Sequence, residues 1–284
     1  ALKEALLSVK EDYENAETAG ISCFFKNSGI GVGLPDVGRC IVSVEEGKIH
    51  VRTSAACIGQ GMATVTTQIA CETLNLPPEM IIAEAPDTRR TPNSGTTTAS
   101  RQSLFTGEAC RRACKQLRVD LDMGYAMADL EGNEYYGEYS AKTDPLVNDK
   151  KNPVSHAGYG YAAEVVILDE KGKLEKITAA YDVGQVVNPR ACEGQIEGGI
   201  VMGMGYALTE NFALEDGYVK AKYATLGLID ATKVPPMDIR FVQSEGIHEG
   251  LAYGVKGVGE LATIPTAPAI AAAYMAFDGK LRPT

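Results

Sequence analysis

The segment GVKGVGE, residues 254–260, places a carboxylate where it could act on a bound molecule. Glu260 follows a glycine-rich turn and comes directly before the apolar Leu261. Poor solvation disfavours the charged form of a carboxyl group, which makes Glu260 a candidate general base near neutral pH. An acidic residue at the start of a helix also stabilises the helix dipole, and the segment alone favours neither interpretation.

A second candidate site is the segment TPNSGTTTAS, residues 91–100, which carries a dense set of hydroxyl groups directly before an expected helix. That helix contains Arg101, Arg111 and Arg112, and the exposed amides of a helix N-terminus bind anions. Thr98 or Ser100 could instead simply cap the helix. Taken alone, the segment favours the capping interpretation.

Two glutamines lie beside glycines, Gln60 between Gly59 and Gly61, and Gln195 after Gly194. A neutral carboxamide at such a turn can hydrogen-bond an oxo group or the edge of a pterin without adding charge. Taken alone, each glutamine is better interpreted as structural.

Hydrophobic patterns predict the elements that position these residues. Helical spacing predicts helices over 1–19, 62–74, 100–117, 191–208 and 267–277. Alternation and turn residues predict strands over 21–25, 40–44, 48–53, 80–84, 160–168, 174–182 and 238–243, and a further hairpin over 211–223. Strands and helices mix without strict β–α–β order, which predicts an α+β fold.

Two lobes are expected, over about residues 20–132 and 153–284, each a two-layer arrangement of a mixed sheet with packed helices. The segment 133–152 is charged, rich in tyrosine and poor in aliphatic residues, so we interpret it as an insertion or linker. In both lobes a hairpin leads into a glycine-containing loop and a helix, with a Gly-Gln dipeptide in each. This repetition indicates an internal duplication.

Composition excludes several classes of protein. A chain of 284 residues with 45% hydrophobic residues can bury a core, unlike a disordered chain. The net charge of −10 and the lack of a basic run argue against nucleic acid as a partner. The longest apolar stretches, such as 267–277, are too short to span a membrane. Seven scattered cysteines favour a reducing, cytoplasmic compartment.

No spacing typical of a metal site is present. The three histidines, His50, His156 and His248, are far apart in the sequence. Cys110 and Cys114 are four residues apart on an expected helix, and buried free thiols are a better interpretation of them than metal ligands. No residue of this chain is therefore expected to bind a metal directly.

Taken in sequence order, six segments resemble the molybdenum-binding subunit or domain of the molybdenum hydroxylases, the xanthine dehydrogenase and aldehyde oxidase family. They are IGQG (58–61), TPNSGTTTAS (91–100), AAEV (162–165), DVGQVVNP (182–189), GQIEGGIVMGMGYALTE (194–210) and GVKGVGE (254–260). The resemblance covers about residues 21–277. It implies that residues 1–284 form a C-terminal portion of a molybdenum cofactor-binding domain.

The resemblance implies a role for each matching residue. Glu260 corresponds to the family's general base, and Gln60 and Gln195 correspond to glutamines that hold the cofactor's pterin or an oxo oxygen. Thr97, Ala99 and Ser100 correspond to a loop that contacts the pterin and phosphate. The other implied cofactor-binding positions are Gly59, Gly61, Lys256, Gly257, Val258 and Gly259.

The implied cofactor is molybdenum with molybdopterin, either plain or in the cytosine dinucleotide form. The implied reaction is hydroxylation of an N-heteroaromatic compound with water as the oxygen source, and the electrons pass to iron–sulfur and FAD groups on partner chains or domains. A purine such as xanthine or hypoxanthine is the expected substrate, which suggests purine metabolism. Nicotinate-type or aldehyde oxidation by the same chemistry is the alternative, and a non-catalytic scaffold with the family fold is another.

The family's N-terminal half of the domain has no counterpart in this sequence. That half supplies a Gly-Gly-Phe-Gly-Gly type loop, another cofactor-facing glutamine, and the arginine and glutamate that orient purines. Cys23, Phe24 and Phe25 lie near the position of a family aromatic, and we interpret Cys23 as its replacement. The N-terminal half is therefore an expected partner, and without it the chain is expected to bind the cofactor weakly and to be inactive.

Overall fold

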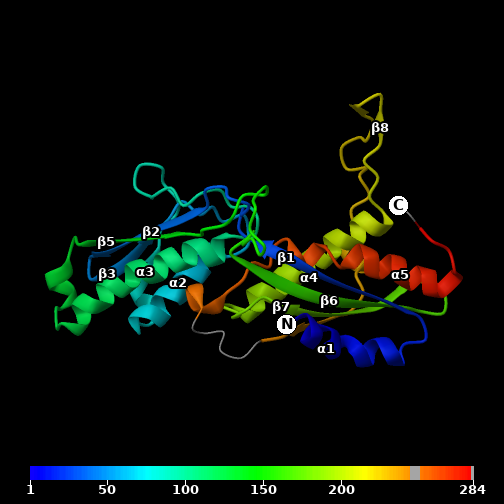
Figure 1. The fold of residues 1–284 in the computed structure, drawn as a ribbon, viewed down its shortest axis with the longest axis horizontal. Coiled ribbons are helices and arrows are strands. Elements are labelled where there is room, and N and C mark those ends of the chain that lie inside the picture. Colours follow the sequence, from blue (N-terminus) through cyan, green and yellow to red (C-terminus); the bar gives the residue numbers. More distant parts are fainter. Residues whose placement is uncertain (244–249, 283–284) are drawn as a thin grey trace.

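Two lobes, each a four-stranded sheet with packed helices, make up the computed structural model, which describes residues 1–243 and 250–282 (Figure 1). The α-helices are α1 (Leu2–Asn15), α2 (Met62–Leu74), α3 (Gln102–Asp122), α4 (Pro189–Leu208) and α5 (Thr266–Asp278). The strands are β1 (Ala19–Ser28), β2 (Val37–Glu45), β3 (Lys48–Arg52), β4 (Ile81–Ala83), β5 (Glu134–Ser140), β6 (Gly158–Leu168), β7 (Leu174–Asp182), β8 (Leu214–Glu215), β9 (Tyr218–Val219) and β10 (Met237–Phe241). Short 3₁₀ helices are η1 (Pro78–Met80), η2 (Met127–Leu130), η3 (Ala231–Lys233), η5 (Leu251–Gly254) and η6 (Leu261–Thr263). The expected α+β class is confirmed.

None of the described helices is both long and apolar enough to cross a membrane.

The first sheet has the strand order β4-β3-β2-β5, and α2 and α3 pack on it. Cys40, Val42 and Val44 alternate along β2 and are fully buried, in one hydrophobic core with Leu74 of α2 and Leu117 of α3. Alternation along a strand turns every second side chain to the same face, so a single apolar face of the hairpin β2–β3 is enough to hold both helices. Cys110 and Cys114 are buried free thiols in the same core.

Strand β5 corrects the expectation that residues 133–152 form an insertion or linker. Residues 134–140 pair antiparallel with β2 and close the first sheet. Tyr135 is buried in the core, and its hydroxyl donates to Asp120 over 2.6 Å. A Cβ on Gly137 would lie 1.9 Å from the carbonyl oxygen of Ala109, so only glycine lets α3 approach the strand this closely.

The second sheet has the strand order β1-β6-β7-β10, with α4 and α5 against one face and α1 against the other. Strand β1 pairs along its whole length with β6, so residues 19–28 belong to this sheet and not to the first lobe as expected. A Cβ on Gly20 would lie 2.1 Å from the backbone nitrogen of Ala273, so β1 is fitted closely beneath α5. Helix α1 adds a third layer to this lobe.

The two sheets have the same topology, which supports the expected duplication. Each contains an antiparallel hairpin, β2–β3 or β6–β7, and a strand parallel to the second hairpin strand, β4 or β10. Each also has a strand antiparallel to the first hairpin strand, β5 in one sheet and β1 in the other. In sequence, β5 follows the hairpin β2–β3, whereas β1 precedes the hairpin β6–β7. From β1 in the second lobe the chain therefore passes through the first lobe and then returns to the second at β6.

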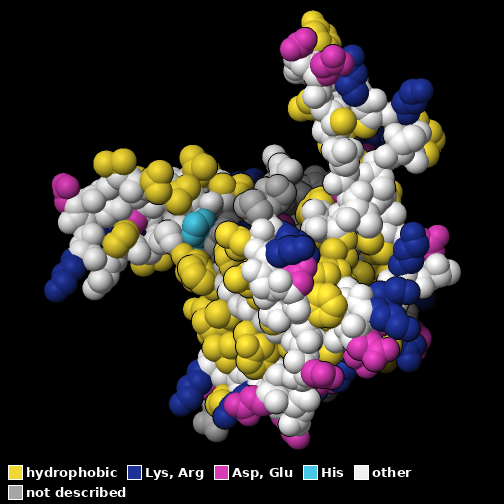
Figure 2. All heavy atoms as spheres, turned by 90° about the vertical axis from the view of Figure 1, so that its right-hand side faces the viewer, with side chains coloured by type: hydrophobic (Ala, Val, Ile, Leu, Met, Phe, Trp, Pro, Cys, Tyr) yellow, Lys and Arg dark blue, Asp and Glu magenta, His cyan; other side chains and the backbone are white. Residues whose placement is uncertain are grey.

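The hairpin β8–β9 and its flanking segments stand away from the second lobe (Figures 1 and 2). Phe212, Leu214, Tyr218 and Val219 on this projection are exposed. Exposed apolar groups on a projection of this kind are typical of contact surfaces.

Glu164, in the AAEV segment, is a fully buried carboxyl group on β6. The hydroxyl of Thr266, the first residue of α5, donates to its Oε2 over 3.1 Å, and Oε1 has no hydrogen-bond partner among the described residues. Burial raises the pKa of Glu164 from 4.5 to about 8. The side chain is therefore protonated at neutral pH in the folded protein.

We expect this protonation to make the stability depend on pH. Below about pH 4.5 the carboxyl is protonated in both states, and between that pH and about 8 only the unfolded chain releases the proton, so the free energy of unfolding falls as pH rises. Glu164→Gln, which is neutral at every pH, should therefore be more stable than the parent by several kcal/mol at pH 8, at about 1.4 kcal/mol per unit of pKa shift. Denaturant unfolding between pH 4 and 9 measures this difference, with the exposed Glu170→Gln as control. Parallel stability curves for the parent and Glu164→Gln would contradict the expectation.

Candidate functional site

A cavity of about 420 Å³ lies between the two lobes. Four segments line it, from residues 58–65 and 97–103 of the first lobe and 183–195 and 255–260 of the second. Most of the predicted site residues meet there: Gln60, Thr97, Ala99, Ser100, Gln195, Lys256, Gly257, Val258, Gly259 and Glu260. Gly59 and Gly61 flank Gln60 with positive φ angles and do not line the cavity themselves.

Arg101 holds the hydroxyl-rich loop 94–100 in shape. Its guanidinium is 1% exposed, pairs with the buried Asp36, and donates to the carbonyl oxygens of Ser94 and Val37 over 2.7 Å each. Arg101 therefore adds no free charge for a bound anion. Arg111 and Arg112 add none either, since both pair with Glu108 on their own helix.

Ser100 joins this loop to the proposed base and does not cap a helix. Helix α3 starts at Gln102 without a side-chain cap. The Ser100 hydroxyl donates to Oε2 of Glu260 over 2.9 Å and accepts the Glu260 backbone N–H over 3.0 Å. Ala99 and Ser100 both have φ of 49°, a left-handed conformation that is strained for residues other than glycine.

Gly257 allows the loop 254–260 to approach the loop 94–100. A Cβ at this position would lie 2.1 Å from the carbonyl oxygen of Ser100, closer than any real contact. The Gly257 N–H donates to the buried hydroxyl of Ser28 over 2.7 Å, which attaches the loop to the end of β1. Next to it, the ammonium of Lys256 pairs with the fully buried Asp182 over 2.7 Å.

Glu260 is more open to water than expected. Its side chain is 49% exposed, because it sits at the rim of the cavity. Oε2 of Glu260 lies 3.0 Å from the ammonium of Lys26 on β1, in addition to its hydrogen bond with Ser100. The expectation of a poorly solvated carboxylate is therefore wrong for the described part of the chain.

The side chain of Gln60 folds back on its own loop. Its Oε1 accepts the N–H of Ile58 over 2.6 Å, and its Nε2 donates to the carbonyl of Ala56 over 3.0 Å. Gln195 lies within α4 and not at a tight turn, and α4 is capped by Asn188, whose Oδ1 accepts the Ala191 N–H over 2.9 Å. The two glutamines approach the cavity from different lobes.

Gln185 is a cavity residue that sequence reasoning missed. Its backbone N–H donates to the carbonyl of Gly254 over 3.1 Å, and its Oε1 is buried without a hydrogen-bond partner among the described residues. A buried acceptor without a donor is costly, so this oxygen is suited to a donor on a bound molecule. The signal that could have found it was a glutamine next to a glycine in the DVGQVVNP segment, the same dipeptide that marks Gln60 and Gln195.

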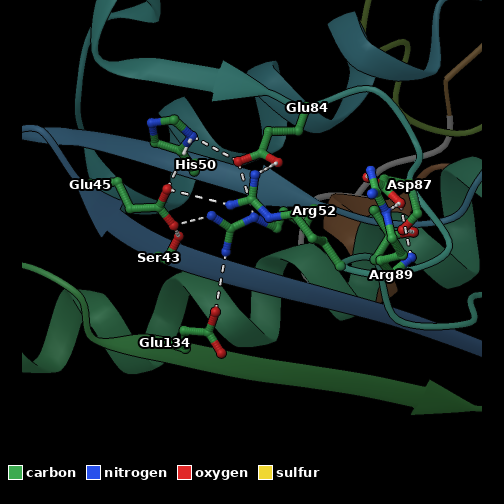
Figure 3. Close-up of polar contacts among 10 residues, drawn as sticks. Ser43, Glu45, His50, Arg52, Glu84, Asp87, Arg89 and Glu134 are labelled. Carbon is green, nitrogen blue, oxygen red and sulfur yellow. Dashed lines mark hydrogen bonds and ion pairs between the residues drawn. The ribbon is translucent and has the colours of Figure 1, made fainter.

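Glu45, His50 and Glu84 converge closely enough to suggest a cation site on the first sheet. Arg52 lies among them, 2% exposed, and pairs with Glu45, with Glu84 over 3.0 Å and with Glu134 over 3.2 Å (Figure 3). The pKa of Glu45 is lowered, chiefly by its hydrogen bond from Arg52. The Arg52 guanidinium supplies the positive charge, so this cluster is an ion-pair network across the strands. Of the three histidines considered from the sequence, His248 lies outside the described residues.

Strand β1 changes the interpretation of the aromatic near the site. Side chains alternate along a strand, so Phe24 and Lys26 share one face of β1, and Cys23 and Phe25 share the other. Since Lys26 contacts Glu260, Phe24 is the aromatic on the same face as the base. The interpretation that Cys23 replaces the family aromatic is not supported by this alternation.

The sequence and fold are similar to those of known molybdenum-cofactor proteins. The molybdopterin cofactor-binding domain family matches residues 4–128 and 122–235. A protein of Bacillus subtilis named as a probable xanthine dehydrogenase subunit is 31% identical over 88% of this chain and 38% of its own length. The gamma subunit of the 6-hydroxypseudooxynicotine dehydrogenase complex of Paenarthrobacter nicotinovorans is 29% identical over 86% of this chain and 35% of its own.

Among solved structures, the aldehyde oxidoreductase of Desulfovibrio gigas matches with a TM-score of 0.79 and 26% identity, over 98% of this chain and 32% of that one. The chain thus spans less than two fifths of the length of these relatives.

We expect Gly257→Ala to loosen the contact that shapes the cavity. The added methyl group would overlap the Ser100 carbonyl, and overpacking of this kind costs about 1–3 kcal/mol. Gly259→Ala is the matched control, because a Cβ there has Ser100 Oγ as its nearest neighbour at an ordinary 3.8 Å. Thermal or denaturant unfolding of the two variants measures the difference, and equal stabilities would show that the two loops are not in close contact.

Proposed function

Because the chain belongs to the molybdopterin cofactor-binding domain family of the molybdenum hydroxylases, we propose that the cavity between its lobes binds molybdenum–molybdopterin and that Glu260 is the general base of a hydroxylation. One observation carries this proposal. Segments far apart in the sequence bring their amide, hydroxyl and carboxylate groups to a single cavity. A non-catalytic scaffold would be supported instead if the assembled complex contained no molybdenum by elemental analysis.

The donor and acceptor groups of the cavity fit such a cofactor. The buried Oε1 of Gln185, without a partner among the described residues, suits a donor on the edge of a pterin. The Thr97 hydroxyl would donate to a phosphate oxygen after releasing the Ala56 carbonyl, and Ser100 Oγ, whose proton goes to Glu260, would accept from the pterin. The carboxamides of Gln60 and Gln195 would bind from opposite lobes after Gln60 releases Ala56 and Ile58. Further contacts would come from the backbone of Ala99 and of residues 256–259, beside the turn of residues 59–61.

When bound, the molybdenum cofactor supplies the redox chemistry and the means of transferring an oxygen atom that originates from water. The part of Glu260 is to accept a proton at its carboxylate. Ser100 holds one carboxylate oxygen in place, and the rim position of Glu260 lets substrate reach the other. Because Glu260 is half exposed, we propose that the N-terminal half of the family's domain shields it from water in the assembled enzyme.

The proposed substrate is an N-heteroaromatic compound, with a purine such as xanthine or hypoxanthine first. The relative named as a probable xanthine dehydrogenase subunit supports a purine, whereas the 6-hydroxypseudooxynicotine dehydrogenase subunit and the aldehyde oxidoreductase support the nicotinate-type and aldehyde alternatives. Reduction of the assembled enzyme by xanthine, nicotinate and benzaldehyde in turn separates these three.

We further propose that iron–sulfur and FAD groups on partner chains accept the electrons. Two relatives are named as subunits, which supports a multi-subunit assembly. The nucleotide released on denaturation would distinguish plain molybdopterin from its cytosine dinucleotide form.

Gln195→Ala should lower the molybdenum content of the assembled enzyme and leave the fold nearly intact. One hydrogen bond contributes about 0.5–1.5 kcal/mol, which corresponds to a loss of binding of roughly tenfold at most. Elemental analysis beside the thermal midpoint measures both effects, and Gln116→Ala, at a glutamine bonded to the Tyr136 carbonyl away from the cavity, is the control. Unchanged molybdenum content would assign Gln195 a structural role only.

Glu260→Gln should keep molybdenum and substrate binding but slow reduction by substrate at least about 100-fold, since glutamine is nearly isosteric and cannot accept the proton. A residue that serves only the helix dipole would instead cost less than about 2 kcal/mol of stability and leave turnover unchanged. Stopped-flow reduction measures the rate, with the exposed Glu193→Gln on α4 as control. A rate within a few-fold of the parent would refute the role of Glu260 as base.

A further inference from the structure

We propose that Lys26 is a positioning residue for Glu260. This role for Lys26 rests on the proposed function and deepens it. Together with Ser100, Lys26 fixes one oxygen of the Glu260 carboxylate, so that only the other oxygen accepts the proton.

The ammonium of Lys26 is itself held in place. It lies 3.2 Å from the carbonyl oxygen of Asn27, 3.1 Å from Asn27 Oδ1 and 3.0 Å from Glu260 Oε2. A lysine ammonium has three donors, and these three acceptors match that number. The Lys26 side chain is only 21% exposed. The Lys26 backbone lies on β1 and pairs with Gly160 of the neighbouring strand β6. Lys26 is thus directed at Glu260 by the sheet and by the adjacent residue.

The two contacts on Glu260 are both made by the same oxygen. Oε2 accepts from Ser100 Oγ over 2.9 Å and from the Lys26 ammonium over 3.0 Å, and Oε1 has no hydrogen bond within the described residues. Without them, a side chain that is 49% exposed would exchange among rotamers at the cavity rim. Displacement of a reacting group by about 1 Å can cost up to about 100-fold in rate, so fixing Oε2 has a direct consequence for the reaction.

The other charged groups around the site are already engaged. Lys256, on the same loop as Glu260, pairs with Asp182. His156 bonds to Ser155 and Tyr159, and its pKa is lowered by burial first and by the charge of Lys26 second. Among the described residues, Lys26 is therefore the cation that contacts the carboxylate of Glu260.

A role in stability alone is a poor explanation for this pair. Ion pairs between partly exposed side chains contribute about 0–1 kcal/mol. The chain offers a control in Lys176, which pairs with Asp12 over 2.8 Å and with Asp238 over 3.7 Å and is 36% exposed. Asp12 belongs to α1, on the face of the second sheet opposite to α4 and α5.

The experiment compares Lys26→Met, Lys26→Arg and Lys176→Met in the assembled enzyme. We expect Lys26→Met to lower kcat about tenfold or more with KM within twofold, and Lys26→Arg to restore most of kcat, since the guanidinium can still bind the carboxylate. Molybdenum content and the thermal midpoint should stay at parent values in all three variants, and Lys176→Met should retain full kcat. In a Glu260→Gln background, Lys26→Met should cause no further loss, because it acts through Glu260.

Three results would overturn the proposal. They are an unchanged kcat in Lys26→Met, an equal loss in Lys26→Arg, and a drop in molybdenum content or thermal midpoint that accounts for the loss of kcat. Lys26→Gln, which can still donate to Asn27, is measured beside Lys26→Met. If Lys26→Met fails to fold, the kcat of Lys26→Gln tests the proposal in its place. The proposed function is judged separately: it fails if Glu260→Gln remains active, and it stands if only the Lys26 variants behave like the parent.

Discussion

The close contact between the loops 94–100 and 254–260 is the constraint on which the cavity depends. Gly257 lies so near the Ser100 carbonyl that a side chain would not fit, and Arg101 fixes the first loop through main-chain oxygens and Asp36. One loop precedes α3 in the first lobe, and the other bonds to residues 183–185, which follow β7, and to the end of β1 in the second. Their contact therefore sets the spacing of the lobes at the cavity and brings Ser100 to Glu260.

Duplication explains why a cavity forms at this place. Two sheets with the same strand order each direct a loop and a helix toward the boundary between them, α2 after Gln60 in one lobe and α4 with Gln195 in the other. Similar units that meet in this way give a ligand two walls of related chemistry. The DVGQVVNP segment adds Gln185, whose buried Oε1 has no hydrogen-bond partner within the described residues.

Local pattern was enough to predict the hairpins β2–β3 and β6–β7 and the five α-helices of the described residues to within about five residues, because apolar runs and the turn residues that bound them mark these elements. Strand β5 was missed because glutamates and tyrosines hide the burial of Tyr135 and Gly137, and the pairing of β1 with β6 joins residues at least 130 positions apart. The residues of the site were predicted by motif. Their contacts were not, since the bonds from Ser100 and Lys26 to Glu260 exist only once three distant segments meet.

We propose that the cavity between the lobes binds the molybdenum cofactor, with the molybdenum beside Glu260. X-ray diffraction from crystals of the assembled enzyme, recorded on both sides of the molybdenum absorption edge, locates the metal directly. We expect a single anomalous peak inside the cavity, beside the Glu260 carboxylate and between Gln60 and Gln195. A peak outside this cavity, or a fully assembled complex without one, would contradict it.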